Sequence, residues 1–134
     1  MNMLESLTEQ IRAAFQSGTP LRIQGGDSKA FYGNASDGAI LDTRVLSGIV
    51  DYQPKELVLT ARAGTPLVDI EAALAAEQQM LAFEPPHFAD PLPNPPPLAG
   101  EGAKAEPKSI HATLGGCIAT GLSGPRRAYA GAVR

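Results

Sequence analysis

Apolar residues recur at spacings of three and four along positions 3–17, with charged and amide residues between them. The positions that share this face are Leu4, Leu7, Ile11 and Phe15. Such spacing is the pattern of an amphipathic helix. Gly18 comes directly after it and Pro20 cannot extend it, so the pattern predicts a helix over residues 3–17.

The apolar runs that follow are short and are separated by turn-forming residues, which is typical of strands. Strands are predicted at residues 21–23, 39–42, 48–52 and 56–63. The last is the strongest, because a Leu-Val-Leu run passes into alternating Thr60 and Arg62. Pro54 at the second position of a turn over residues 53–55 predicts that residues 48–62 form a hairpin.

A second helix is predicted from Thr65 to near Gln79. Thr65 is of a residue type that caps helices, and Pro66 suits the first helical position. The buried stripe expected here consists of Leu67, Ile70 and Leu74. Asp69 and Glu71 suit the positive end of the helix dipole, an interpretation preferred to an acid–base pair. Residues 80–83 are expected to be extended.

Composition changes sharply after Phe83, because prolines dominate the next stretch. Residues 85–110 are predicted to be a proline-rich insert or loop, exposed and partly polyproline II or disordered. A surface insertion is preferred to a proline-rich recognition segment. The order of helices and strands elsewhere predicts an α+β fold.

The length, charge and composition of the chain argue against several classes of function. A chain of 134 residues fits one domain, and its net charge of -3 argues against non-specific nucleic-acid binding. No apolar run reaches the roughly 18 residues of a membrane span, and no secretory signal is predicted. The single Cys117 suits a reducing compartment, so a cytoplasmic location is expected. The only histidine or cysteine side chains that could bind a metal ion are His87, His111 and Cys117, so no metal site is predicted.

A glycine-containing loop follows the first predicted strand. Its residues are Gln24, Gly25, Gly26, Asp27, Ser28 and Lys29. Paired glycines allow close approach to a ligand, Ser28 offers a donor and Lys29 a positive charge, which together suit a phosphate. The spacing is not that of a Walker A loop, and a strand-to-turn connection with a solvated Lys29 is the alternative.

A second glycine-rich run covers residues 113–127 and contains three hydroxyl residues before an arginine pair. Backbone N–H groups beside glycines can form an anion site, so the run is a candidate wall for the pyrophosphate and flavin side of a dinucleotide. A glycine-rich surface turn is the alternative. Arg126 and Arg127 are candidates for phosphate, carboxylate or subunit contact.

The order of these features resembles the N-terminal half of the FAD-binding domain of the vanillyl-alcohol oxidase (PCMH-type) superfamily. Within it, the chain looks like the FAD-binding subunits of bacterial glycolate oxidases. The segments that carry the resemblance are residues 20–31, 57–74, 83–87 and 114–127. The resemblance implies a partial domain over residues 1–134, with a small βαβ-like subdomain and the start of a second. Substrate-binding residues would then lie beyond Arg134.

The resemblance also implies site roles. Cofactor-binding residues would be Gln24, Gly25, Gly26, Asp27, Ser28, Lys29, Gly115, Gly116, Ala119, Thr120, Gly121 and Ser123. Some members attach FAD covalently through a histidine in the first loop, but positions 22–33 contain none, so non-covalent FAD is expected. No catalytic residue is assigned. Cys117 is expected to be a small packing residue, and His87 a conformational or partner-contact residue.

The implied activity is flavin-dependent oxidation of a short 2-hydroxy acid, glycolate to glyoxylate, in glycolate catabolism. The implied partners are further flavoprotein and iron–sulfur subunits, which could bring the chain to the periphery of the inner membrane. Two alternatives stay open: a D-lactate dehydrogenase-like flavoenzyme of the same superfamily, and a non-catalytic flavin-binding or scaffold subunit.

Overall fold

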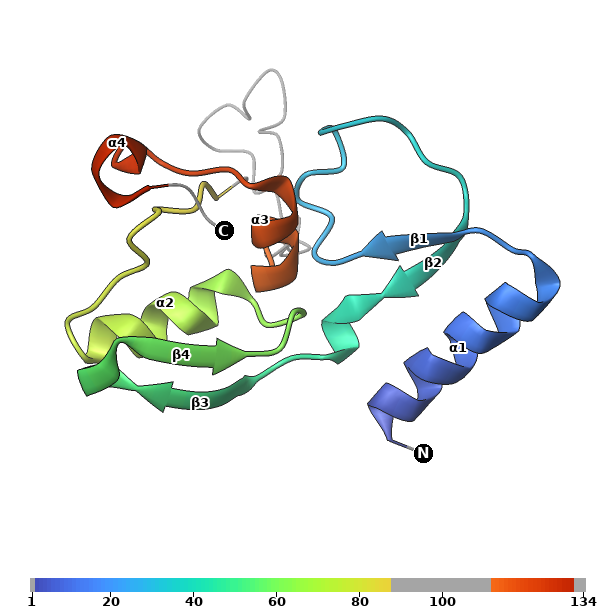
Figure 1. Cartoon of the computed structure of the whole chain (residues 1–134), viewed down its shortest axis with the longest axis horizontal. Helices are drawn as coiled ribbons and strands as arrows, with labels where there is room; N and C mark the ends of the chain where they lie inside the picture. The colour runs from blue at the N-terminus through green and yellow to red at the C-terminus, as the bar shows by residue number, and fades with distance from the viewer. Residues whose placement is uncertain (1, 88–111, 132–134) are drawn as a thin grey trace, which may run out of the picture.

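The computed structural model describes residues 2–87 and 112–131 (Figure 1). The helices in this part are α1 (Met3–Ser17), α2 (Leu67–Ala76), α3 (Leu114–Thr120) and α4 (Arg127–Ala130). The strands are β1 (Leu21–Gln24), β2 (Ala39–Asp42), β3 (Ile49–Gln53) and β4 (Val58–Ala61), with 3₁₀ turns η1 (Thr43–Val45) and η2 (Pro54–Glu56). The predicted α+β class is confirmed, whereas most of the proline-rich stretch 85–110 lies outside the described residues.

Helix α1 has the bounds that the sequence predicts. Asn2 caps its start by accepting a hydrogen bond from the Leu4 N–H at 3.3 Å, and the Asn2 N–H donates to the Glu5 carboxylate at 2.8 Å. Gly18 ends the helix in the left-handed conformation, with φ 65°. Only Leu7 of the predicted apolar face is buried, and Phe15 is 87% exposed. The periodicity therefore predicted the helix but not the environment of its apolar face.

The strands form two separate pairs. Strands β1 and β2 are parallel, from Leu21 opposite Ala39 to Gln24 opposite Asp42. The connection between them is the loop 25–38, which contains no helix. Strands β3 and β4 form the predicted antiparallel hairpin, with an irregularity between Ile49 and Asp51. The parallel pair of a βαβ-like unit is thus present, but an open loop takes the place of the connecting helix.

Thr65 does not cap α2, so that prediction was wrong. The capping position belongs to Pro66, which makes no side-chain cap hydrogen bond. The Thr65 hydroxyl instead accepts from the Gly48 N–H at 2.9 Å and lies 2.7 Å from the Arg62 carbonyl oxygen. Thr65 itself is only 1% exposed, and its hydroxyl pairs with backbone groups beside the hairpin, which a capping orientation would leave without this partner.

The end of α2 and the segment after it also differ from the prediction. The helix stops at Ala76 because the chain turns away at Gln78, which has φ 57°. The Gln79 side chain then donates to the Pro54 carbonyl oxygen at 2.8 Å and so ties this turn to η2. Residues 80–83 are not extended throughout, because they include a turn in which the Glu84 N–H bonds the Leu81 carbonyl oxygen at 3.1 Å.

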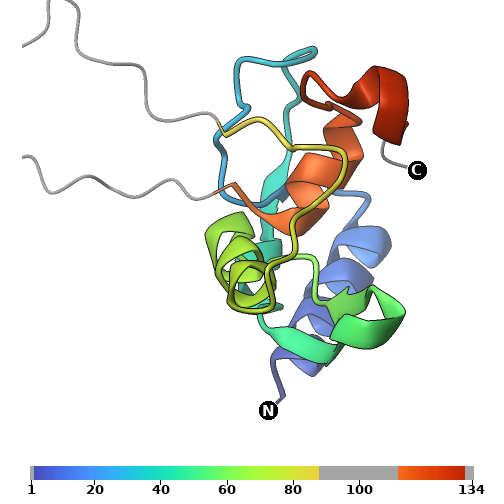
Figure 2. The ribbon, with the colours of Figure 1, turned by 90° about the vertical axis from the view of Figure 1, so that its left-hand side faces the viewer.

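The core lies where α2 meets α3. Leu67, Ala112 and Cys117 form a buried cluster, against which Leu81 and Phe83 pack. The predicted stripe on α2 is confirmed, since Leu67 and Ile70 are 0% exposed and Leu74 is 5% exposed. Figure 1 shows α3 between the α2–hairpin unit and the loop that follows β1, and Figure 2 shows the same neighbours from the side. The core thus holds α3 next to that loop.

Backbone hydrogen bonds fix α3 against the entry to α2. The Leu67 N–H donates to the Ala112 carbonyl oxygen at 2.8 Å, and the Leu114 N–H donates to the Thr65 carbonyl oxygen at 2.9 Å. The Gly115 N–H adds a bond of 2.8 Å to the Ala63 carbonyl oxygen. The first half of the glycine-rich run is therefore a docked helix and not an open loop, and Gly121 ends it with φ 63°. No helix among the described residues is long and apolar enough to cross a membrane.

Candidate functional site

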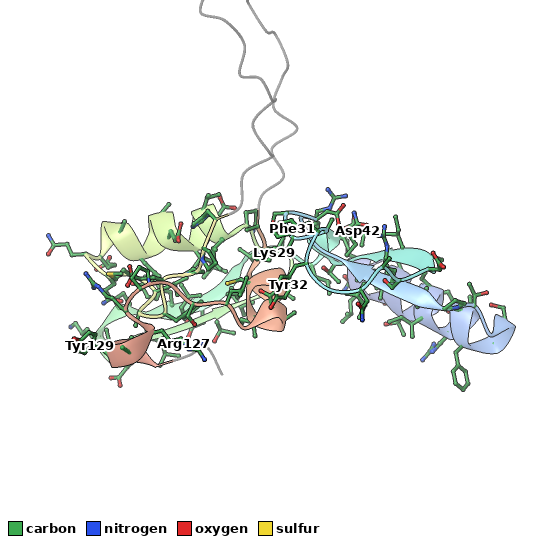
Figure 3. The ribbon with its side chains drawn as sticks, turned by 90° about the horizontal axis from the view of Figure 1, so that it is seen from above. Lys29, Phe31, Tyr32, Asp42, Arg127 and Tyr129 are labelled. Atoms are coloured by element: carbon green, nitrogen blue, oxygen red, sulfur yellow. The ribbon has the colours of Figure 1, made fainter. Side chains whose placement is uncertain are left out.

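A cavity of about 270 Å³ lies between the loop after β1 and helix α3. It brings together the two glycine-containing segments that the sequence singled out. Predicted site residues that line it are Gln24, Gly25, Gly26, Asp27, Ser28, Lys29, Gly116, Ala119 and Thr120. Figure 3 shows Lys29 and Tyr32 beside α3, on the side that faces the loop. The structure therefore makes one cavity from two segments almost ninety positions apart in the sequence.

The first wall of the cavity, the β1 wall, consists of residues 22–29. Its start is fixed by the Thr43 hydroxyl, which donates to the Gln24 carbonyl oxygen at 3.0 Å. The Arg22 guanidinium donates to the Gln24 amide oxygen at 3.0 Å. Asp27 adopts the left-handed conformation with φ 60°, and the Ala30 N–H bonds the Asp27 carbonyl oxygen at 3.2 Å. The loop thus turns sharply while keeping Arg22 and Lys29 at the cavity.

The second wall, the α3 wall, consists of residues 112–120. Thr113 caps α3 by accepting a hydrogen bond from the Gly116 N–H at 3.3 Å. The Thr120 hydroxyl lies 3.0 Å from the Cys117 carbonyl oxygen and also lines the cavity. Cys117 is 0% exposed and belongs to the core. The expected packing role of this cysteine agrees with its burial.

Burial also sets the chemistry of the Cys117 thiol. Desolvation raises the pKa of Cys117 above its ordinary value, the positive charge of Lys29 acts in the opposite direction, and the Glu71 carboxylate adds to the rise. A raised pKa keeps the thiol protonated and weakly nucleophilic at neutral pH. Cys117 is therefore a packing group beside the cavity, and the charges of Lys29 and Glu71 act on the pKa of its thiol in opposite directions.

Three predicted site residues do not line this cavity. Gly115 instead packs against the scaffold, because a Cβ added there would come within 2.9 Å of the Ala63 Cβ. Gly121 ends α3, and the Ser123 hydroxyl is buried without a hydrogen-bond partner among the described residues. The role of Gly115 is thus to let α3 dock closely on residue 63, and any cofactor contact of Gly121 or Ser123 stays a prediction.

The structure adds lining residues that the sequence reasoning missed. They are Arg22, Ile23, Ala30, Tyr32, Asn34, Ala35, Ser36 and Thr113. Arg22 could have been found, because alternate residues of a strand share one face and Arg22 stands two positions before Gln24. The segment 32–36 carries no sequence motif that points to the cavity. It reaches the cavity through the fold of the loop 25–38.

Arg126 and His87 contact residues that line a different hollow, whereas His111 lies outside the described residues. A cavity of about 370 Å³ is lined by Glu71, Gln79, Met80 and Glu84, among others. His87 Nε2 lies 2.8 Å from a Glu71 carboxylate oxygen. Arg126 Nε lies 3.4 Å from Glu84 Oε1, an ion pair without hydrogen-bond geometry. Arg126 is therefore engaged away from the first cavity, and the described residues contain no His, Cys, Asp and Glu grouping suited to a metal.

The donors of the first cavity suit a phosphate-containing ligand. Arg22 and Lys29 supply positive charge, while Ser28 and Thr120 supply hydroxyls. The glycines allow the backbone N–H groups of the β1 wall to approach an anion. A volume of about 270 Å³ is small for a dinucleotide, since ligand sites for smaller molecules already occupy about 300–1,000 Å³. The cavity therefore fits the diphosphate portion of such a ligand and not the whole of it.

The fold and cavity agree with the comparisons to known proteins. The family model of the FAD binding domain matches residues 3–90, which includes the whole β1 wall. The chain belongs to the FAD binding domain family, and FAD is its cofactor. The match of this model ends before the α3 wall, so the assignment of that wall rests on the geometry of the cavity.

A curated relative extends the similarity to the rest of the chain. The chain is 47% identical over 130 residues to the glycolate oxidase subunit GlcE of Escherichia coli (strain K12). The alignment covers 97% of this chain and 31% of that subunit, so the chain spans about a third of the relative's length. No solved structure matches the chain significantly.

Proposed function

We propose that this chain forms part of the FAD site of a subunit that oxidises glycolate to glyoxylate within a larger oxidase or dehydrogenase complex. The observation that carries the proposal is the 47% identity to a glycolate oxidase subunit across 97% of the chain. The cavity between the β1 wall and the α3 wall supplies the structural support, because it gathers most of the site residues implied by the sequence.

In this proposal the two walls make different contacts with the cofactor. The β1 wall binds the diphosphate through its backbone N–H groups, with Arg22 and Lys29 offsetting the negative charge. The α3 wall approaches closely at Gly116 and offers the Thr120 hydroxyl. FAD bound between these walls would supply the redox chemistry that oxidises the 2-hydroxy acid. We assign the residues of this chain to orienting the cofactor and assign none of them to binding the substrate.

FAD is held non-covalently in this proposal. Positions 22–33 contain no histidine that could link to the flavin, and the Cys117 thiol is buried in the core cluster. The expected partners are further flavoprotein and iron–sulfur subunits, through which the chain would act in the cytoplasm or at the inner face of the membrane. The relative is a subunit of a glycolate oxidase, and this supports the proposal that the chain acts within a multi-subunit complex.

The test is glycolate-dependent dye reduction by the purified chain, alone and together with the other subunits of a bacterial glycolate oxidase. We expect reduction only when the partner subunits are present, and none with acetate, which lacks the 2-hydroxyl group. Faster reduction with D-lactate than with glycolate would favour the D-lactate dehydrogenase-like alternative. Bound flavin with no reduction by either acid would favour a non-catalytic subunit.

A further inference from the structure

Thr113 lies at the junction between the scaffold and both walls of the cavity. It is 3% exposed, and an isolated β-bridge pairs it with Pro66. The hydrogen bonds of its two chain neighbours, from Leu67 N–H to Ala112 and from Leu114 N–H to Thr65, hold its backbone in place. The position of Thr113 is therefore set by the entry to α2, independently of the loop after β1.

The Thr113 side chain reaches both walls from this position. Its hydroxyl oxygen accepts from the Gly116 N–H at 3.3 Å, which caps α3. The same oxygen lies 2.6 Å from the point where a Cβ on Gly25 would stand. A contact that short is not found for real Cβ atoms, so a side chain at residue 25 would force either the Thr113 side chain or the loop after β1 to shift. One hydroxyl thus contacts the start of the second wall and the middle of the first.

The backbone conformation does not explain the glycine at position 25. Gly25 is not among the glycines with positive φ, and any residue type could adopt its conformation. Space is the remaining requirement, and the three atoms nearest to a Cβ on Gly25 all belong to Thr113. The fit between these two residues therefore determines how closely the β1 wall approaches α3.

We infer that Thr113 is the positioning residue of the cavity, which sets the separation of the two walls by filling the space that Gly25 leaves empty. It acts through Gly25 and Gly116, whose backbone groups border the cavity. The inference deepens the proposed function, because it concerns the same FAD site. The contact itself is a property of the fold and can be tested without the cofactor.

The experiment is a double-mutant cycle with Gly25→Ala and Thr113→Ala in the full chain, measured by thermal unfolding and by FAD titration. We expect Gly25→Ala to lower the Tm by about 5 °C, because its methyl group collides with Thr113. It should also weaken FAD binding about tenfold by displacing the β1 wall. In the Thr113→Ala background the collision is absent, so Gly25→Ala should cost less than half as much in both readouts.

Two further variants separate positioning from general stability. Thr113→Ser keeps the hydroxyl, so FAD affinity should stay within about twofold of the parent. Gly38→Ala is the matched control, because its Cβ would collide with the Pro20 carbonyl oxygen at 2.8 Å, far along the chain from Thr113. Its Tm loss should simply add to that of Thr113→Ala.

Additive effects of Gly25→Ala and Thr113→Ala would overturn the inference. So would a Thr113→Ser variant that loses as much FAD affinity as Thr113→Ala. If the parent chain bound no FAD, the proposed cofactor site would fail, whereas the Tm cycle would still decide whether Thr113 and Gly25 are coupled. Failure of the inference and failure of the proposed function therefore give different results.

Discussion

The two walls of the cavity are built in contrasting ways. No residue of the stretch 24–29 in the β1 wall is buried, whereas Ala112, Thr113 and Cys117 of the α3 wall all are. The β1 wall begins in the pairing of β1 with β2, and the Thr43 hydroxyl donates a hydrogen bond to the Gln24 carbonyl oxygen. The α3 wall is held by a hydrophobic cluster and three backbone hydrogen bonds to residues around the start of α2.

This contrast predicts that the α3 wall contributes mainly to the stability of the fold and the β1 wall mainly to ligand binding. Substitutions beneath the α3 wall should lower the stability of the whole unit, because they remove buried contacts. Substitutions on the β1 wall should weaken ligand binding with little loss of stability, because its side chains are partly solvated. Thr113 and Gly25 are the exceptions. Thr113 is buried and also contacts the β1 wall, and a methyl group at Gly25 would collide with Thr113 and so lower stability as well.

The largest expected effect comes from Leu67→Ala, which removes a 0% exposed side chain from the cluster beneath the α3 wall. We expect a loss of about 2–5 kcal/mol in the free energy of unfolding, measured by urea denaturation. Val68→Ala is the matched control, because Val68 is the next residue of α2 and is 42% exposed. A similar loss in both variants would mean that the cluster does not support the fold.

Thr65→Val should have the next largest effect. The substitution keeps the shape of the side chain but leaves the Gly48 N–H without the acceptor that now lies at 2.9 Å. We expect a loss of about 1–3 kcal/mol in the free energy of unfolding. Thr60→Val on the exposed side of β4 serves as the control, with a change within about 0.5 kcal/mol. An unchanged Thr65→Val protein would show that these hydrogen bonds are dispensable.

Arg22→Gln tests the β1 wall. Removal of the guanidinium should raise the Kd for FAD about tenfold, because a charge-assisted contact to phosphate is lost. The Tm should change little, and FAD binding should become less sensitive to salt. Arg12→Gln on the exposed surface of α1 makes the same change of charge away from the cavity. Equal effects of the two substitutions on Kd would contradict a specific role for Arg22.

The smallest expected effect is a pH dependence from Cys117. Because burial raises the pKa of this thiol in the folded state, the folded protein holds the proton at a pH where the unfolded chain loses it. The associated stability is fully present below the ordinary thiol pKa of about 9.0 and declines as the pH rises beyond it. Urea denaturation from pH 7 to 10 should show a steeper decline for the parent than for Cys117→Ala.

The sequence predicted local structure better than environment. Periodicity located both α1 and α2, yet the stripe on α2 is buried while Phe15 on α1 is 87% exposed. Periodicity defines an apolar face and carries no information about what covers it. Thr65 has the residue type of a cap, but its hydroxyl forms hydrogen bonds with the backbone of Gly48 and Arg62 instead. Contacts with residues distant in sequence determine both the burial of these apolar faces and the orientation of the Thr65 side chain.

The candidate site was predictable to a similar degree. The loop 24–29 could be recognised because its glycines directly follow a strand. The run at Gly115 and Gly116 could not be recognised as a helix, since glycine has a low helix propensity and the helix depends on bonds to residues 63 and 65. Thr113 was missed because its importance lies in a contact with Gly25, which is distant in sequence.

The central claim is that the β1 wall and the α3 wall together bind FAD non-covalently. The most direct measurement is the visible absorption spectrum of the purified full chain after incubation with FAD and removal of excess cofactor, followed by denaturation. We expect flavin bands at a near-stoichiometric level, complete release of free FAD on denaturation, and weaker retention in both Arg22→Gln and Gly25→Ala. Absence of flavin bands, flavin that stays attached to the denatured chain, or full retention in both variants would contradict the claim.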